Sequence, residues 1–210
     1  MKRTFLFIFI GLTFISNTFA QNMRELVRTM PDSILPLLTR NDRLDFIDYL
    51  DSNMKAEVTN KMGGKSEMTK ITDDYAHINI SPNSEIAFKL LPCDKDSIIC
   101  MIHTYTSTAS ESRLKFYTLK WEILRTEDFI KIPSIDIFFT PSDTLTQAEN
   151  KNLRNKLDVC LVKANFNEVS STDLTLTLTT PLYMSEENRK ATANYIKQSI
   201  KKKWNGKRFE

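Results

Sequence analysis

Between Ser66 and Trp121 the chain alternates short apolar stretches with polar breaks, and this pattern limits the possible folds more than any other feature. The apolar stretches are Met68–Ile71, Ala76–Ile80, Glu85–Leu91, Ser97–Thr104 and Leu114–Trp121. The breaks at Ser81–Ser84, Asp94–Asp96 and Ser107–Ser110 are each short enough for a hairpin turn. The pattern predicts an antiparallel meander of four or five strands.

The segment before this pattern reads as helical. Residues 24–57 carry apolar side chains at helical spacing, and Pro31 and Pro36 divide them into short pieces. The longest helix is predicted from about Asp42 to Glu57, with Asn41 or Asp42 as its N-cap. Packing of these helices against the meander gives an α+β fold, an antiparallel sheet with helices on one face.

The segment after the meander mixes strands and helices. Strands are predicted at Ile135–Thr140, around Val159–Ala164, and at Leu174–Thr179, where leucine and threonine alternate. This alternation predicts one polar side on the last strand, where a partner could bind.

Two helices are predicted in the same segment. Thr146 and Glu149 have the spacing of a capping box and open the first helix. The second starts after Ser185 and ends in Lys201–Lys203, whose charges suit the negative end of a helix dipole, with Gly206 as the stop.

Residues 1–20 have the anatomy of a secretory signal peptide. Lys2 and Arg3 precede the apolar run Phe5–Ile15, and small residues lead to a predicted cleavage after Ala20. The remaining residues, 21–210, are predicted to form a single domain without a transmembrane segment. Periplasmic location and secretion both remain open.

The net charge argues against nucleic-acid binding. The whole chain has a formal charge of +3, and without Lys2 and Arg3 it carries 27 basic and 26 acidic residues. A nearly balanced surface offers little attraction for a polyanion.

Three cysteines would face an oxidising compartment after export. Cys93 and Cys100 flank a polar turn, so a disulfide across that hairpin is the first hypothesis. Cys160 lies in an apolar run and reads as a buried thiol.

No motif for a cofactor, a metal or catalysis stands out. The exported part contains three glycines, Gly63, Gly64 and Gly206, which is too few for a phosphate-binding loop. His77 and His103 fall inside predicted strands, without the spacing of a zinc site. The sequence therefore assigns no catalytic, cofactor-binding or metal-binding residue.

Two acidic or nucleophilic patterns have simpler interpretations. Asp42, Asp45, Asp48 and Asp51 recur every three residues, which is typical of the solvated side of a helix. Ser52 and Lys55 match the Ser-x-x-Lys of penicillin-interacting enzymes, but the Lys-Thr-Gly of that group is missing.

The C-terminus combines five basic residues with two aromatic ones. Lys201, Lys202, Lys203, Lys207 and Arg208 could meet an anionic surface. The favoured interpretation is a tail that docks on the core through Trp204 and Phe209.

Four segments of the chain resemble an exported family of unknown function found in Bacteroidales. They are Met30–Thr39, Leu44–Leu50, Asn60–Ser66 and Lys203–Lys207. The resemblance implies a small periplasmic or secreted domain and transfers no catalytic residue.

Two functional hypotheses follow. The first is a non-enzymatic binding or accessory protein of the cell envelope, whose partner is a protein or another envelope component. The second is an envelope hydrolase whose site assembles only in three dimensions, from Ser52, Lys55, His77, His103 and the aspartate row. A structural partner in a larger assembly is a third possibility.

Overall fold

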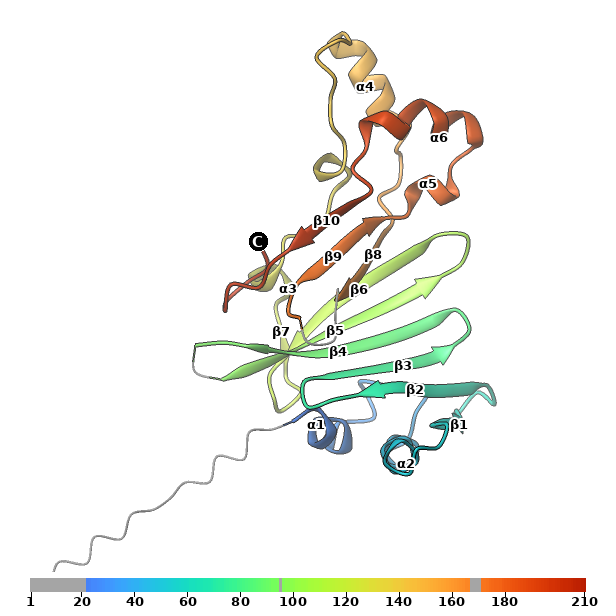
Figure 1. Cartoon of the computed structure of the whole chain (residues 1–210), viewed down its shortest axis with the longest axis vertical. Helices are drawn as coiled ribbons and strands as arrows, with labels where there is room; N and C mark the ends of the chain where they lie inside the picture. The colour runs from blue at the N-terminus through green and yellow to red at the C-terminus, as the bar shows by residue number, and fades with distance from the viewer. Residues whose placement is uncertain (1–21, 95, 167–170) are drawn as a thin grey trace, which may run out of the picture.

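The computed structural model describes residues 22–94, 96–166 and 171–210, so the predicted signal peptide and its cleavage point lie outside the described residues. The fold is α+β, as predicted, and the molecule is elongated (Figure 1). The N-terminal helices lie at one end, a large antiparallel sheet in the middle, and a small sheet with further helices at the other end.

The large sheet is a seven-stranded meander in which neighbours in sequence are neighbours in space. Its strands are β1 (Glu57–Thr59), β2 (Lys65–Ile71), β3 (Tyr75–Ser81), β4 (Ser84–Pro92), β5 (Ser97–Thr106), β6 (Ser110–Tyr117) and β7 (Ile123–Leu124). The five predicted stretches correspond to β2–β6, so the meander is confirmed. The prediction of four or five strands was too low, because the edge strands β1 and β7 are too short to show a periodic pattern.

Two N-terminal helices precede this sheet, α1 (Met23–Thr29) and α2 (Arg40–Asp51). The predicted limits of α2 and its predicted caps were wrong. Thr39 is the N-cap, and Asp42 completes a capping box, with its carboxylate accepting the Thr39 N–H at 2.6 Å. The helix ends early because Asn53 adopts a positive φ of 55° and the chain then extends into β1.

The first core lies between these helices and one face of β2–β5. Leu26 of α1 and Phe46 of α2 are fully buried in it, together with Ile78 and Phe88 from the sheet. The predicted packing of helices on one face is therefore confirmed.

The opposite face of the sheet holds a second core, which the sequence did not predict. A three-stranded antiparallel sheet in the order β10-β9-β8 packs there, formed by β8 (Val162–Phe166), β9 (Leu174–Leu178) and β10 (Ser199–Lys202). The leucines of β9 are buried with Cys100, Ile102 and Phe116 of the large sheet. The surrounding helices are α3 (Thr126–Phe129), η1 (Ile135–Ile137), α4 (Gln147–Asn155), α5 (Thr180–Tyr183), α6 (Glu186–Thr192) and η2 (Ala193–Tyr195).

Two elements differ from the predictions in this half. The predicted strand Ile135–Thr140 is mostly the 3₁₀ turn η1, followed by one isolated bridge between Phe139 and Ile196. The capping box of Thr146 and Glu149 is confirmed at the start of α4.

The last helix stops at Thr192, so Lys201 and Lys202 do not lie at a helix end. They belong to β10, because Ile200 and its neighbours pair with β9. The predicted docking of the tail is confirmed: Phe209 is buried, and the indole Nε1 of Trp204 donates a hydrogen bond to the Pro92 carbonyl at 2.7 Å.

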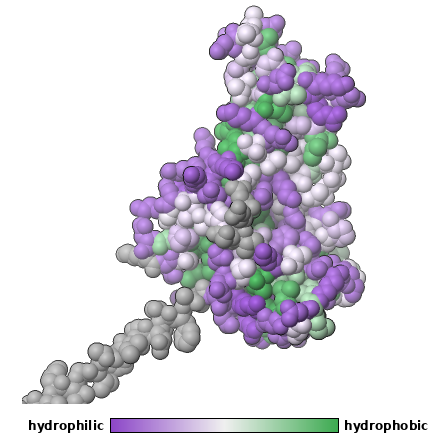
Figure 2. All heavy atoms as spheres, in the orientation of Figure 1, coloured by the Kyte–Doolittle hydropathy of each residue, from purple (hydrophilic) through white to green (hydrophobic). Residues whose placement is uncertain are grey.

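Within the described ranges, no helix is long and apolar enough to cross a membrane. On the face shown in Figure 2, hydrophobic residues form separate patches between hydrophilic ones.

Candidate functional site

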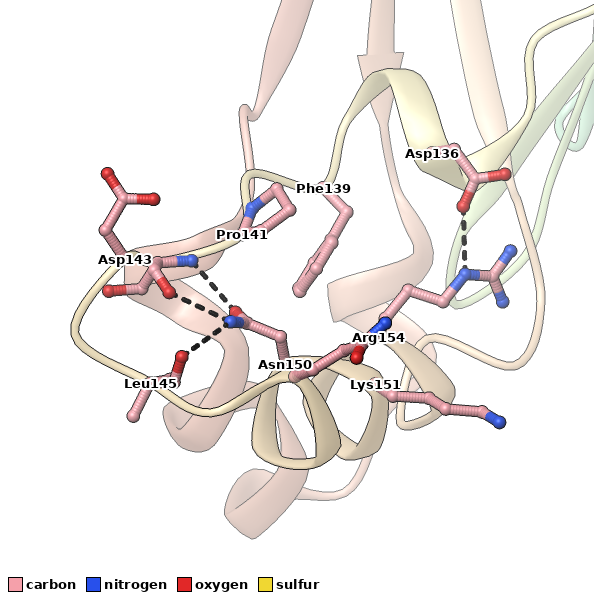
Figure 3. Close-up of a pocket in the computed structure, with 10 residues that line it drawn as sticks. Asp136, Phe139, Pro141, Asp143, Leu145, Asn150, Lys151 and Arg154 are labelled. Atoms are coloured by element: carbon pink, nitrogen blue, oxygen red, sulfur yellow. Dashed lines mark hydrogen bonds and ion pairs between the residues drawn. The ribbon is translucent and has the colours of Figure 1, made fainter.

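One hollow lies beside α4, and its own side chains hold it together (Figure 3). It has a volume of about 670 Å³. Asn150 accepts the Ser142 N–H at 2.9 Å and donates to the carbonyls of Ser142 and Leu145. Arg154 pairs with Asp136 at 2.9 Å on the exposed side. These contacts brace the loop before α4 and tie Arg154 to Asp136, so the groups that make them serve the structure of the hollow.

A second hollow, the His103 groove, lies between the loop at 33–37 and the ends of β3–β6. Its volume is about 490 Å³, within the usual range for small-molecule sites. The apolar side chains that line it are Ile34, Leu35, Pro36, Leu37, Ile80, Ile86 and Met101. The polar side chains are Ser33, Ser81, Ser84, His103, Tyr105 and Lys115.

The strand register explains why polar groups converge in this groove. Ser84 of β4 is opposite Tyr105 of β5, and Ile86 is opposite His103. Because side chains alternate across a strand, all four point to the face that carries the first core. On this face, the apolar residues of the first core are therefore followed by polar side chains at one end of the sheet.

A chain of three hydrogen-bonding groups crosses this polar end. Ser84 Oγ lies 2.8 Å from His103 Nε2, and Tyr105 Oη lies 3.0 Å from His103 Nδ1. The His103 and Tyr105 rings also stack, with centroids 4.1 Å apart.

The surroundings of His103 favour the neutral imidazole. Burial lowers the pKa of His103, and the positive charges of Lys115 and Arg113 lower it further. His103 is hydrogen-bonded only to hydroxyl groups among the described residues. A protonated ring would therefore meet two cations with no carboxylate among its hydrogen-bond partners.

His77 lies on the opposite face of the sheet, in a smaller polar hollow of about 300 Å³. Its Nδ1 is 2.7 Å from Thr69 Oγ1, and its Nε2 is 3.5 Å from a Glu85 carboxylate oxygen. Lys163 of β8 holds the other oxygen of Glu85 at 2.9 Å. Burial raises the pKa of Glu85, but Lys163 and His77 outweigh it and hold the pKa below the ordinary value. This network ties the two sheets together.

The residues considered for a hydrolase do not converge. His77 and His103 lie on opposite faces of the large sheet. Ser52 and Lys55 are exposed at the end of α2, where Lys55 pairs with Glu57 at 2.6 Å.

Of the aspartate row, Asp45, Asp48 and Asp51 are exposed along α2 and Asp42 serves the cap. The solvated interpretation of the row is therefore confirmed. Across the described ranges, no group of three or more His, Cys, Asp or Glu side chains is placed to hold a metal ion.

The predicted disulfide is contradicted, since all three cysteines are free. Cys100 pairs with Lys89 inside the β4–β5 ladder, whereas Cys93 lies in the turn beyond Pro92 and Ser97. Three residues of strand separate Ser97 from Cys100, roughly 10 Å, which exceeds the reach of a disulfide. Cys160 is half-buried rather than buried.

No sequence pattern singles out Ser84, Tyr105, Arg113 or Lys115. Ser84 is the last residue of a predicted turn, and the other three lie on β5 and β6 without a motif around them. The period-two pattern does place residues 101, 103 and 105 on one face, but it does not reveal which face carries the helices.

Comparison with known proteins places the chain among uncharacterised relatives. A family model described as "Protein of unknown function (DUF3256)" matches residues 15–209. A solved structure, described as a domain of an uncharacterized protein from Porphyromonas gingivalis W83, is similar with a TM-score of 0.79 at 23% identity. The similarity covers 91% of this chain and 98% of that one, and it supports the fold alone. No curated protein matches the chain.

Proposed function

The chain belongs to the DUF3256 family of unknown function, and from this premise we propose that it is an exported, non-enzymatic binding protein of the cell envelope with the His103 groove as its ligand site. The observation that carries the proposal is the composition of this groove. Apolar walls and a few convergent polar groups are the usual features of a small-molecule site. Export is supported by the signal-peptide pattern of residues 1–20.

The groove supports this proposal better than the open sheet face considered from the sequence. β8–β10 cover part of the face opposite the helices, and the leucine side of β9 is buried against it. The helix face remains open beyond the loop at 33–37, where Lys115 and Tyr105 are exposed.

A hydrolase remains the second candidate, because Ser84 and His103 have the separation of a nucleophile and its base. The charges around His103 weigh against it. A base that removes the Ser84 proton becomes an imidazolium, and here Lys115 and Arg113 would destabilise that cation. Triads of this type place a carboxylate at that position, whereas Tyr105 supplies a neutral hydroxyl.

Ligand binding can be tested by blocking the groove. Ser33 is exposed and lines it, so Ser33→Trp adds bulk there without disturbing the core. Ser52→Trp makes the same change at an exposed site outside the groove. Protein purified from its native envelope should carry a small molecule in native mass spectrometry, retained by Ser52→Trp and lost by Ser33→Trp. Equal retention by both variants would place the ligand elsewhere.

The catalytic alternative has its own test. Labelling by a fluorophosphonate probe that depends on Ser84, abolished by Ser84→Ala but unaffected by Ser81→Ala, would establish a serine nucleophile and overturn the non-enzymatic proposal. We expect no specific labelling.

Export needs a separate experiment. The intact mass and N-terminal sequence of the protein from fractionated native cells should show a chain that begins at Gln21, outside the cytoplasm. Recovery of the uncleaved chain from the cytoplasm would contradict this.

A further inference from the structure

We infer that the ligand of the His103 groove is an amphipathic monocarboxylate, a molecule with one carboxylate head and an acyl or aryl body. This inference rests on the proposed binding function and specifies its ligand class. It follows from the arrangement of cations, hydroxyl groups and apolar walls at one end of the large sheet.

Two cations lie at or beside the groove: Lys115 lines it, and Arg113 is on the same face of β6. On β6, Arg113 is opposite His103 and Lys115 is opposite Met101, so both lie on the face that carries the groove. Both are exposed, and within the described part of the chain neither forms an ion pair or a hydrogen bond. Glu111 lies on the same face of β6, which leaves a net charge of +1 on that strand face.

Neutral hydrogen-bonding groups stand beside these cations. Ser84, His103 and Tyr105 lie on the two neighbouring strands, and the Tyr105 side chain is 45% exposed at the rim. A guanidinium binds a carboxylate through two parallel N–H groups. Of the two hydroxyl groups bonded to neutral His103, the one that accepts the ring N–H keeps its own proton and can donate it to a remaining lone pair of the carboxylate. A single carboxylate therefore matches the charge and the donors at this end.

The rest of the groove suits an apolar body. Ile80, Ile86 and Met101 form its floor and are each at most 6% exposed, and Ile34 and Leu37 of the loop close it from above. Carbon atoms placed there would be removed from water, which favours binding. Because these five side chains are apolar, this part of the groove favours a hydrocarbon body over a sugar or a peptide.

The test uses the mature protein, residues 21–210, with dansylaminoundecanoic acid as the fluorescent probe and three competitors of equal chain length. Dodecanoate should displace the probe about tenfold more effectively than dodecanol, and its advantage should shrink as salt rises, since exposed charges are screened. Lys115→Gln should weaken dodecanoate binding about fivefold and leave dodecanol unchanged, as expected for one exposed ion pair. Lys70→Gln, which removes an exposed lysine from β2, is the matched control and should change neither.

The outcomes separate this inference from the proposed function. Equal displacement by dodecanol and dodecanoate, blocked by Ser33→Trp, would keep the groove as a ligand site and overturn the carboxylate. Stronger displacement by dodecyl phosphate would overturn it in favour of a phosphate head. Failure of the probe to bind saturably would count against both the ligand class and the groove.

Discussion

At the residue scale, one buried arginine organises the N-terminal helices. Arg43 of α2 is fully buried, and its guanidinium donates to the carbonyls of Val27, Met30 and Leu38. It also pairs with Asp32 at 2.9 Å. These contacts satisfy carbonyl groups at the end of α1 and in the loop that follows, a loop that goes on to form one wall of the groove.

Replacing this arginine should therefore be costly. Arg43→Leu leaves three buried carbonyls without donors, and we expect the free energy of unfolding to fall by about 3 kcal/mol in urea titrations. Arg40→Leu, at an exposed position of the same helix, should change it by less than about 0.5 kcal/mol. Similar losses for both variants would show that the guanidinium contacts contribute little.

The pKa of His103 reports on the charges around the groove. Burial and the neighbouring cations hold the pKa of His103 below its ordinary value of 6.5. The unfolded chain then binds more protons than the folded one. The stability contributed by neutral His103 is therefore present above pH 6.5 and is lost as the pH falls through the folded pKa.

In an NMR titration of the two histidine rings, His103 should titrate below 6.5, and Lys115→Gln should move its midpoint upward. An unchanged midpoint in that variant would remove Lys115 from the surroundings of His103.

At the scale of elements, the C-terminal tail, residues 204–209, packs on the second core and connects its parts. Gly206 adopts a positive φ of 89°, which lets residues 204–209 turn back so that Trp204 and Phe209 form a bridge. The Phe209 ring lies near Phe116 of β6, and Phe209 N–H donates to the Phe129 carbonyl at 2.7 Å. The tail thus joins β6 to α3.

Removing the buried Phe209 ring should weaken the packing of the tail on the second core. Phe209→Ala should lower the free energy of unfolding by about 3 kcal/mol, the usual cost of deleting a buried phenyl ring. Arg208→Ala, at the exposed neighbouring position, serves as the control and should be nearly neutral. If both variants had the same midpoint in chemical denaturation, the Phe209 ring would contribute nothing measurable to stability.

At the scale of the whole molecule, the large sheet belongs to two cores at once. Ile99 and Met101 of β5 are buried with the N-terminal helices, while Cys100 and Ile102 are buried against the small sheet. Because alternate residues of one strand serve opposite cores, neither core can unfold without exposing part of the other.

This arrangement predicts one cooperative unfolding transition, as expected for a single domain. The two tryptophans report on different halves, Trp121 from the first core and Trp204 from the second. The variants Trp121→Phe and Trp204→Phe each keep one tryptophan. For each variant, the thermal midpoint measured by tryptophan fluorescence should equal the midpoint measured by far-UV circular dichroism. Two separated transitions would divide the chain into two folding units.

The sequence by itself determined the local elements. Period-two alternation identified β2–β6, Thr146 and Glu149 identified the start of α4, and the Leu-Thr alternation identified β9. These features depend on neighbours a few residues apart, which is the range over which a pattern carries information. Misplaced limits, such as the end of α2, arose where the chain left the helix at Asn53 to form β1, which pairs with β2, although the helical spacing of apolar residues continued.

Only the tertiary structure decided what faces what. It placed Cys93 and Cys100 out of reach, moved Lys201 and Lys202 into a strand, and set His77 and His103 on opposite faces. It also brought Ser84, His103, Tyr105 and Lys115 together from three strands. The physical reason is that a period-two pattern divides the residues of a strand into two sets without showing which core each set faces. Helices pack on one face of the sheet and a second sheet packs on the other, and only this packing distinguishes the two sets.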